Sequence, residues 1–187
     1  MRVFLVVAAT LALCACERGS DTQVVAGCMR TATHEVTWTN ADAADVITTS
    51  SQGPTCQQAV VTLVVRNASG DPLWSFASMY YGMRFGGLPP ENAPSVPVED
   101  MEAFLASWAD TTTMRSGELP QWNEDEDAPA AADSAFTYET PLDREAYRTQ
   151  RDRNLPMICY AAGVETTQCL IAPPGSRTPS MIVAYGP

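Results

Sequence analysis

The sequence predicts an α+β fold, an antiparallel β-sheet with one or two covering helices; a β-sandwich with helical insertions is the alternative. Two observations point to this fold class. Runs of alternating apolar and polar residues recur along the chain between turn-forming residues, which is typical of antiparallel strands. Two later segments, residues 98–109 and 141–151, instead carry helical signals. The 187-residue chain is long enough for one domain with a sizeable core.

The first sixteen residues have the composition of a secretory signal that ends at a lipid-attachment motif. One Arg precedes an apolar run over residues 3–13, which is too short to span a bilayer. The run ends in Leu13-Cys14-Ala15-Cys16, which resembles the lipobox of bacterial lipoproteins. The resemblance implies cleavage after Ala15 and acylation of Cys16. An ordinary signal peptide cut near Ala15 is the alternative.

By this resemblance, Cys16 carries acyl chains such as palmitate, which anchor the mature protein to a membrane. Each buried CH₂ contributes about 0.8 kcal/mol, so several acyl chains hold firmly where one does not. Glu17 follows the lipidated residue and, by comparison with enteric lipoproteins, implies the outer membrane, facing the periplasm. Residues 16–22 then form the lipidated Cys and its polar tether, and residues 23–187 a single globular domain of the cell envelope.

Four further cysteines follow the anchor, and an even number in an oxidising compartment predicts disulfides. Of the three pairings that exist, we favour Cys28–Cys56 and Cys159–Cys169, because each pair keeps to its own end of the chain. The spacings are long and no C-x-x-C motif occurs, which argues against a metal or redox site. We therefore expect structural disulfides and no cofactor.

The predicted strands are short apolar or alternating runs between turn residues. They cover residues 24–29, 33–39, 46–49, 58–66, 73–81, 157–161, 169–172 and 181–185. The clearest pair is 58–66 and 73–81, which flank a loop rich in Asn, Gly, Asp and Pro. Both strands of this hairpin are apolar on both faces, so we expect them at the centre of the sheet.

Two helices are predicted to cover that sheet. Residues 98–109 carry four apolar residues at the i, i+3, i+4 and i+7 spacing of one helical stripe. The second helix, residues 141–151, has a start signal in which Thr140 caps, Pro141 takes the first position and Asp143 completes a capping box.

Acidic residues dominate the charge of the chain, whose net charge is −11. Phosphate binding requires clustered cations, so nucleic acid is not an expected partner. Residues 123–135 are acidic and low in complexity, and we expect an exposed, mobile loop. The loop opens with Asn123, Asp125 and Asp127, yet Ala128 stands where an EF-hand requires Gly, so no metal is expected.

No constellation of catalytic residues is visible. His34 is the sole histidine, and it lies in a Thr-rich strand without any G-x-S-x-G motif elsewhere. No Gly-rich phosphate loop occurs either. We therefore predict that the protein is not an enzyme.

Two groups of residues are candidates for ligand binding. An aromatic run that continues to Phe85 is able to line an apolar pocket or to fill the core; its candidates are Trp74, Phe76, Tyr80 and Tyr81. A basic cluster is able to hold a phosphate, a lipid headgroup or an acidic partner, or to pair with nearby acids; its members are Arg144, Arg148 and Arg151.

The sequence thus predicts a lipid-anchored cell-envelope protein, a non-catalytic interaction or accessory module whose partners are the membrane and another envelope protein. The alternative is a periplasmic small-molecule or inhibitor-type binding module with an aromatic pocket. Full burial of the aromatic rings favours the first reading, and a pocket lined by them favours the second.

Overall fold

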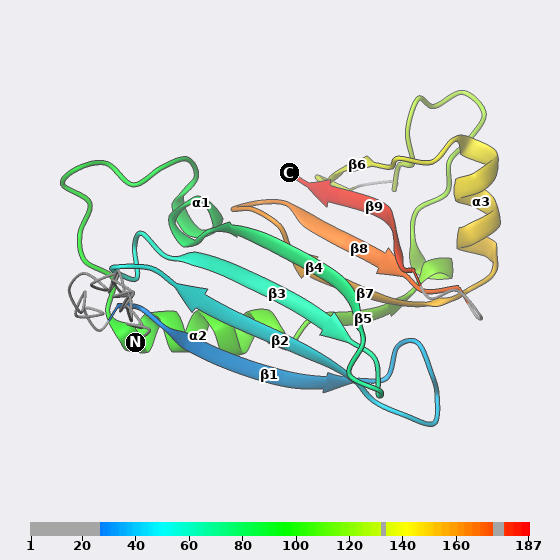
Figure 1. Cartoon of the computed structure of the whole chain (residues 1–187). Coiled ribbons are helices and arrows are strands. Elements are labelled where there is room, and N and C mark those ends of the chain that lie inside the picture. The colour runs from blue at the N-terminus through cyan, green and yellow to red at the C-terminus, as the bar shows by residue number, and fades with distance from the viewer. Residues whose placement is uncertain (1–26, 132–133, 174–177) are drawn as a thin grey trace, which may run out of the picture.

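The computed structural model describes residues 27–131, 134–173 and 178–187 (Figure 1). It confirms the α+β fold class, because these residues form two antiparallel sheets and three α-helices. The predicted lipobox with Cys16, the predicted tether and residues 24–26 of the predicted strand 24–29 lie outside the described residues. The described half of that strand prediction is wrong, because residues 27–29 form no strand and β1 begins at Arg30. Among the described residues, no helix combines the length and apolar character that a membrane crossing needs.

The first sheet is a meander in the order β1-β2-β3-β4. Its strands are β1 (Arg30–Val36), β2 (Asp45–Gln52), β3 (Val60–Arg66) and β4 (Pro72–Met79). The alternation of the sequence sets its inner face, since Val61, Leu63 and Val65 are fully buried while their neighbours in β3 are partly exposed. β1 begins at Arg30 and ends at Val36, three residues earlier than the predicted 33–39, and His34 and Val36 share the inward side as expected.

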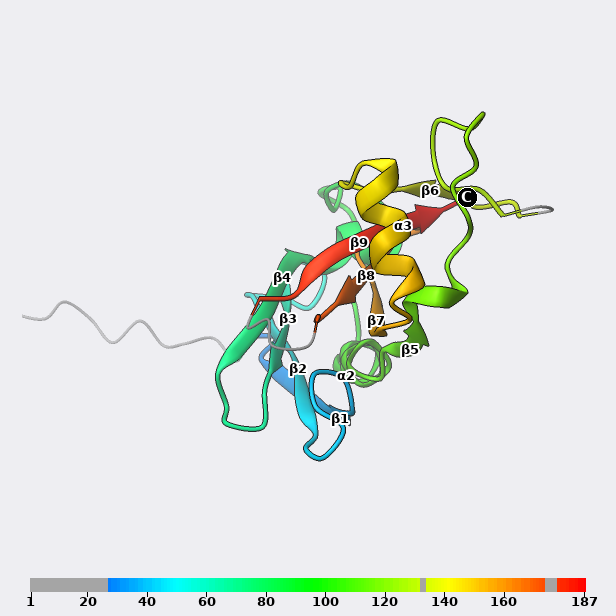
Figure 2. The same ribbon diagram turned by 90° about the vertical axis from the view of Figure 1, so that its right-hand side faces the viewer.

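Helix α2 (Val98–Ala109) covers the inner face of the first sheet, at the bounds that the sequence predicts (Figure 2). Its apolar stripe is buried at Met101, Leu105 and Trp108. The Thr49 hydroxyl of β2 donates to the Leu105 carbonyl at 2.8 Å, which satisfies a polar group inside this contact.

The second sheet has the order β5-β7-β8-β9-β6. Its strands are β5 (Thr112–Arg115), β6 (Thr137–Glu139), β7 (Pro156–Ala161), β8 (Thr167–Ile171) and β9 (Ser180–Gly186). β7, β8 and β9 match the three predicted C-terminal strands closely. The 3-10 turn η1 (Ser116–Glu118) follows β5, and α3 (Arg144–Asp152) lies beside the sheet with its buried Tyr147 turned inward.

The predicted start of the second helix is wrong by three residues. Asp143 is the N-cap of α3, and its side chain accepts a hydrogen bond from the Ala146 backbone N–H at 2.8 Å. The Thr140 hydroxyl donates to the Ile182 carbonyl of β9 at 2.6 Å and accepts from the Leu142 N–H at 3.2 Å, so it lies in the turn before the helix and not at the cap. The contact with β9 therefore engages Thr140, which the sequence pattern had assigned to the start of the helix.

The expectation that both strands of the 58–66/73–81 hairpin are central is also only half correct. β3 lies between β2 and β4, but β4 is an edge strand of the first sheet. Its apolar residues contact the second sheet instead of a further strand, as the Trp74 indole N–H donates to the Tyr160 hydroxyl of β7 at 3.0 Å. The predicted strand also ends at Met79, where helix α1 (Tyr80–Phe85) begins.

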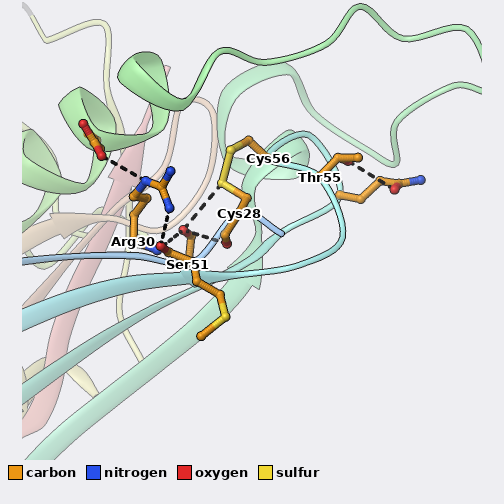
Figure 3. Close-up of a disulfide and its surroundings, with 8 residues drawn as sticks. Cys28, Arg30, Ser51, Thr55 and Cys56 are labelled. Atoms are coloured by element: carbon orange, nitrogen blue, oxygen red, sulfur yellow. Dashed lines mark hydrogen bonds and ion pairs between the residues drawn. A yellow bond between two sulfur atoms is a disulfide. The ribbon is translucent and has the colours of Figure 1, made fainter. Parts of the chain in front are cut away.

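Both predicted disulfides are confirmed. Cys28 bonds to Cys56 at the end of the first sheet where β1 begins, and Ser51 donates its hydroxyl to the Cys28 carbonyl beside this bond (Figure 3). Cys159 bonds to Cys169, which is its direct partner in the register of β7 and β8. The two bonds therefore cross-link one sheet each.

Candidate functional site

A cleft of about 640 Å³ opens between α1, α2 and the loop of residues 86–97 that joins them. Four rings lie along it; they are Tyr80, Tyr81, Phe85 and Phe104. The loop of the cleft is rich in proline, and its Pro94 and Pro97 add apolar wall. The volume falls within the range of about 300–1,000 Å³ that is typical of ligand sites.

The rings form a fixed floor and an open rim. Tyr80 is only 4% exposed and meets Phe104 edge to face at 5.1 Å between ring centroids. Phe104 stacks in turn on buried Trp108 at 5.4 Å, so the floor is continuous with the core. At the rim, Phe85 is 59% exposed and contacts Tyr81 at 4.8 Å. An exposed ring pair beside a rigid floor offers an occupant apolar area at little ordering cost.

Two opposite charges face this cleft, Arg84 from α1 and Asp100 from the first turn of α2. Within the described part of the chain neither side chain has a hydrogen bond or an ion pair. An arginine donates up to five hydrogen bonds and a carboxylate accepts several, so both groups keep their capacity for an occupant. The cleft is thus suited to an apolar body that carries polar or charged groups.

The predicted aromatic candidates separate into two pairs. Tyr80 and Tyr81 line the cleft, whereas Trp74 and Phe76 lie between the sheets. Phe76 packs at 5.4 Å from Tyr160 and 6.1 Å from Trp108. Burial raises the pKa of Tyr160, and the hydrogen bond from Trp74 lowers it by a smaller amount. Trp74 and Phe76 therefore hold the sheets together.

Sequence reasoning did not assign Arg84, Asp100 or Phe104 to a site. Phe104 was attributed to the apolar stripe of the 98–109 helix alone, and it serves both that helix and the cleft. Arg84 stands inside the aromatic run, between Tyr81 and Phe85. An arginine among closely spaced rings is the composition of a binding patch, and this signal was present in the sequence.

The three arginines of α3 contact the chain's own backbone. Arg144 donates to the Glu126 carbonyl at 2.7 Å, and its guanidinium lies 5.5 Å from the Trp122 ring centroid. Arg148 donates twice to the Trp122 carbonyl, at 3.2 and 2.9 Å.

The third of these arginines completes the same arrangement. Arg151 donates to the Leu119 carbonyl at 2.7 Å and forms an ion pair with exposed Asp152 at 3.1 Å. Between the arginines, the Tyr147 hydroxyl donates to the Pro120 carbonyl at 2.9 Å. Burial raises the pKa of Tyr147 to about 12, partly offset by the positive charge of Arg151. We call these four side chains and the carbonyls of residues 119–126 the arginine clasp.

The clasp holds the described part of the acidic loop at its base. Trp122 donates its indole N–H to the Glu126 carbonyl at 2.9 Å, and the Gln121 and Ala130 backbones form an isolated β-bridge. The guanidinium groups of α3 thus meet backbone carbonyls and one neighbouring carboxylate, Asp152.

His34 lies on β1 with its Nε2 3.4 Å from Asp110, and both side chains are well exposed. Within the described ranges, no group of three or more His, Cys, Asp or Glu side chains is arranged to hold a metal ion. The lining of the cleft contains no histidine or cysteine. The groups that it offers to an occupant are aromatic rings and two charges.

Comparison of the chain with protein-family models, curated proteins and solved structures found no match.

Proposed function

We propose that this protein is a lipid-anchored interaction module of the bacterial cell envelope, non-catalytic, and that it holds another envelope protein through the cleft between α1 and α2. The observation that carries the proposal is the open aromatic rim of that cleft, where Tyr81 and Phe85 lie beside Arg84. Aromatic residues and arginine dominate the binding energy of most protein interfaces.

The anchor is supported by the sequence and by the sulfur chemistry of the domain. The lipobox ends at Cys16, and the four later cysteines form two disulfides, which persist in oxidising compartments. Both features favour a lipid on Cys16 and a domain in the periplasm, and Glu17 favours the outer membrane.

The chemistry of the cleft defines the segment of the partner that it suits. Apolar side chains of the partner fill the space over Phe104, a carboxylate reaches Arg84 and a cation reaches Asp100. The floor is rigid and buried, so docking orders few side chains of this protein beyond the rim.

A small molecule is the second candidate occupant, and two observations favour it. Tyr80, Tyr81 and Phe85 line a pocket, which is the outcome expected of a ligand-binding module. Arg84 and Asp100 face one open cleft of about 640 Å³ without pairing to each other, as a site for a zwitterion with an apolar body requires. In that case the protein is a periplasmic small-molecule binding module.

The anchor is tested by Cys16→Ala. We expect the variant to leave the membrane fraction, because it lacks the thiol that receives the acyl chains. Fractionation followed by immunoblotting measures the change. Retention of the variant in the membrane pellet after a high-salt wash contradicts lipid anchoring.

The cleft is tested by photo-crosslinking in living cells from position 81. We expect one adduct of defined mass, identified by mass spectrometry as an envelope protein. Ala103→Arg fills the cleft and abolishes this adduct, while Ala106→Arg, an exposed position of the same helix outside the cleft, leaves it unchanged.

Two results contradict the interaction module. An adduct that survives Ala103→Arg places the contact outside the cleft. The absence of any protein adduct, together with a small molecule retained by the wild type and lost from Ala103→Arg in native mass spectrometry, establishes the second candidate instead.

A further inference from the structure

We propose that the end of the domain where the described chain begins lies against the phospholipid surface. We call it the apolar end, and it consists of Met29, Val60, Phe85, Leu88 and Val164. Phe85 lies where this end borders the cleft and is also part of the cleft rim. The proposal rests on the lipid anchor of the preceding subsection and adds an orientation to it. The domain has a preferred orientation on the membrane, in which one face contacts the bilayer.

Exposure singles out these side chains. Within the described residues, six large apolar side chains are strongly exposed, and five of them make up the apolar end. Their exposed fractions are 58% for Met29, 42% for Val60, 59% for Phe85, 78% for Leu88 and 50% for Val164. The sixth, Phe136, packs against Tyr185 of β9. Single exposed apolar residues need no explanation, whereas their concentration at one end marks an interaction surface.

The first sheet brings two of the five together. Met29 directly precedes β1, and Val60 is the first residue of β3. Gln52 of β2 pairs with Val60, and its neighbour Ser51 pairs with Arg30, so Met29 and Val60 lie in the same end row of the sheet. They are two strands apart, about 10 Å.

The other three residues lie around α1 at the same end. Phe85 ends α1 and Leu88 follows it in the loop of residues 86–97. The tip of the β7–β8 hairpin approaches from the second sheet, where a Val164 methyl lies 3.8 Å from the position of a Cβ on Gly86. The Gln57 side chain donates to the Ala93 carbonyl at 3.4 Å, which ties this loop to the segment of Cys56. Figure 1 shows the beginning of β1, the beginning of β3 and this loop at one end of the domain.

The covalent path to the anchor also leads to this end. Ten residues lie between Cys16 and Gly27, the first described residue, and the eleven steps of chain that they make span about 40 Å at most. The Cys28–Cys56 disulfide follows at once and fastens the chain to the end of the first sheet (Figure 3). The anchor is therefore joined to the domain at the apolar end, which brings the exposed side chains of this end nearest to the lipid.

The charges at this end define the kind of lipid surface. Arg30 is paired with Glu102 at 2.9 Å, and Arg84 beside Phe85 is a single cation. Exposed Glu91 and Glu99 add negative charge. Such a surface has no polybasic attraction for anionic lipid, so the contact depends on apolar area. The matching surface is a zwitterionic bilayer, and the contact is insensitive to salt.

The orientation is tested with the lipidated chain reconstituted into phosphatidylcholine vesicles, with and without brominated acyl chains. Leu88→Trp places a fluorophore at the apolar end without touching the lining of the cleft. Ala68→Trp is the matched control in the exposed β3–β4 turn. This turn lies beyond the far end of β3, about 25 Å along the chain from Val60 at the apolar end. Unsubstituted protein gives the background from the native tryptophans.

We expect bromine to reduce the added emission of Leu88→Trp and to leave that of Ala68→Trp unchanged, at low and at high salt alike. Flotation of the vesicles is scored on the same samples. Protein that floats without selective quenching at position 88 overturns the orientation and leaves the anchor intact. Protein that does not float overturns the anchor itself and the orientation with it.

Discussion

The two sheets differ in how much of their surface the rest of the chain covers. The outer face of the first sheet is open in both views of the molecule (Figures 1 and 2). It carries small, mainly uncharged side chains such as Thr31, Thr33 and Thr62. In the second sheet consecutive residues are buried, as in Met157, Ile158 and Cys159 of β7, because side chains on both faces are covered.

The arginines of α3 and Arg84 of α1 show a related contrast. Those of α3 donate to the chain's own carbonyls, as Arg66 of β3 also does with the Gly70 carbonyl at 3.0 Å, whereas Arg84 has no partner among the described residues. Hydrogen bonds within the chain stabilise a fold, and unused capacity at a surface is what a binding partner requires. The comparison therefore assigns stability to the arginines of α3 and recognition to Arg84.

The largest expected effect comes from removing the disulfides, one from each sheet. Cys28→Ala with Cys56→Ala opens a loop of 28 residues, and Cys159→Ala with Cys169→Ala a loop of 10. The chain-entropy model gives losses of about 3.6 and about 2.8 kcal/mol in the free energy of unfolding. Urea denaturation of both double variants measures the order, and chemical reduction of the wild type is the control that leaves the cysteine side chains in place. A larger loss from the second pair means that buried packing in the second sheet outweighs loop length.

A smaller effect concerns pH and tests the packing of α3. The pKa of Tyr147 is raised from 10.0 to about 12, so between these values the unfolded chain releases a proton that the folded chain keeps. Stability is complete below pH 10 and falls as the pH rises toward 12, by a total on the order of 2 kcal/mol.

Tyr147→Phe is the variant that isolates this decline. It lacks the hydrogen bond to Pro120 and is therefore less stable than the wild type below pH 10. Because it has no phenol to titrate, this deficit shrinks as the pH rises, and its urea midpoint falls less steeply between pH 9 and 11 than that of the wild type. Tyr160 keeps a smaller slope of the same sign in both proteins. Parallel slopes in the two proteins contradict the buried state assigned to Tyr147.

The sequence was most informative for elements that pack on one face only, because their apolar residues then follow a clear period. The stripe of 98–109 and the alternation of 33–39 correctly predicted an amphipathic helix and a strand, because each packs on one side only. Both disulfides followed from the order of the cysteines along the chain. The short edge strands β5 and β6, of four and three residues, carry too little pattern to be recognised.

The rest depended on contacts between distant segments. Trp74 and Phe76 are apolar because the second sheet lies against them, which a strand pattern cannot distinguish from a place at the sheet centre. α1 was read as the end of a strand because aromatic residues favour strands and its six residues complete fewer than two turns. The sequence predicted only part of the cleft lining, its two tyrosines. Arg84 and Asp100 come to face the same cleft only through the placement of α1 and α2.

The smallest expected effect is the sharpest test of the contrast between the arginines of α3 and Arg84, since it applies one substitution to both. Arg151→Gln removes the bond to the Leu119 carbonyl from a side chain that is only 20% exposed, and we expect a loss of about 1–2 kcal/mol in the free energy of unfolding. Arg84→Gln removes no contact among the described residues, so its effect on stability stays within about 0.5 kcal/mol. Urea denaturation of the two variants measures this difference. The order reverses for recognition, because Arg84→Gln weakens the adduct formed from position 81 while Arg151→Gln leaves it intact. Equal losses of stability would mean that Arg84 already has a structural role, and the cleft would then lose the cation on which its selectivity depends.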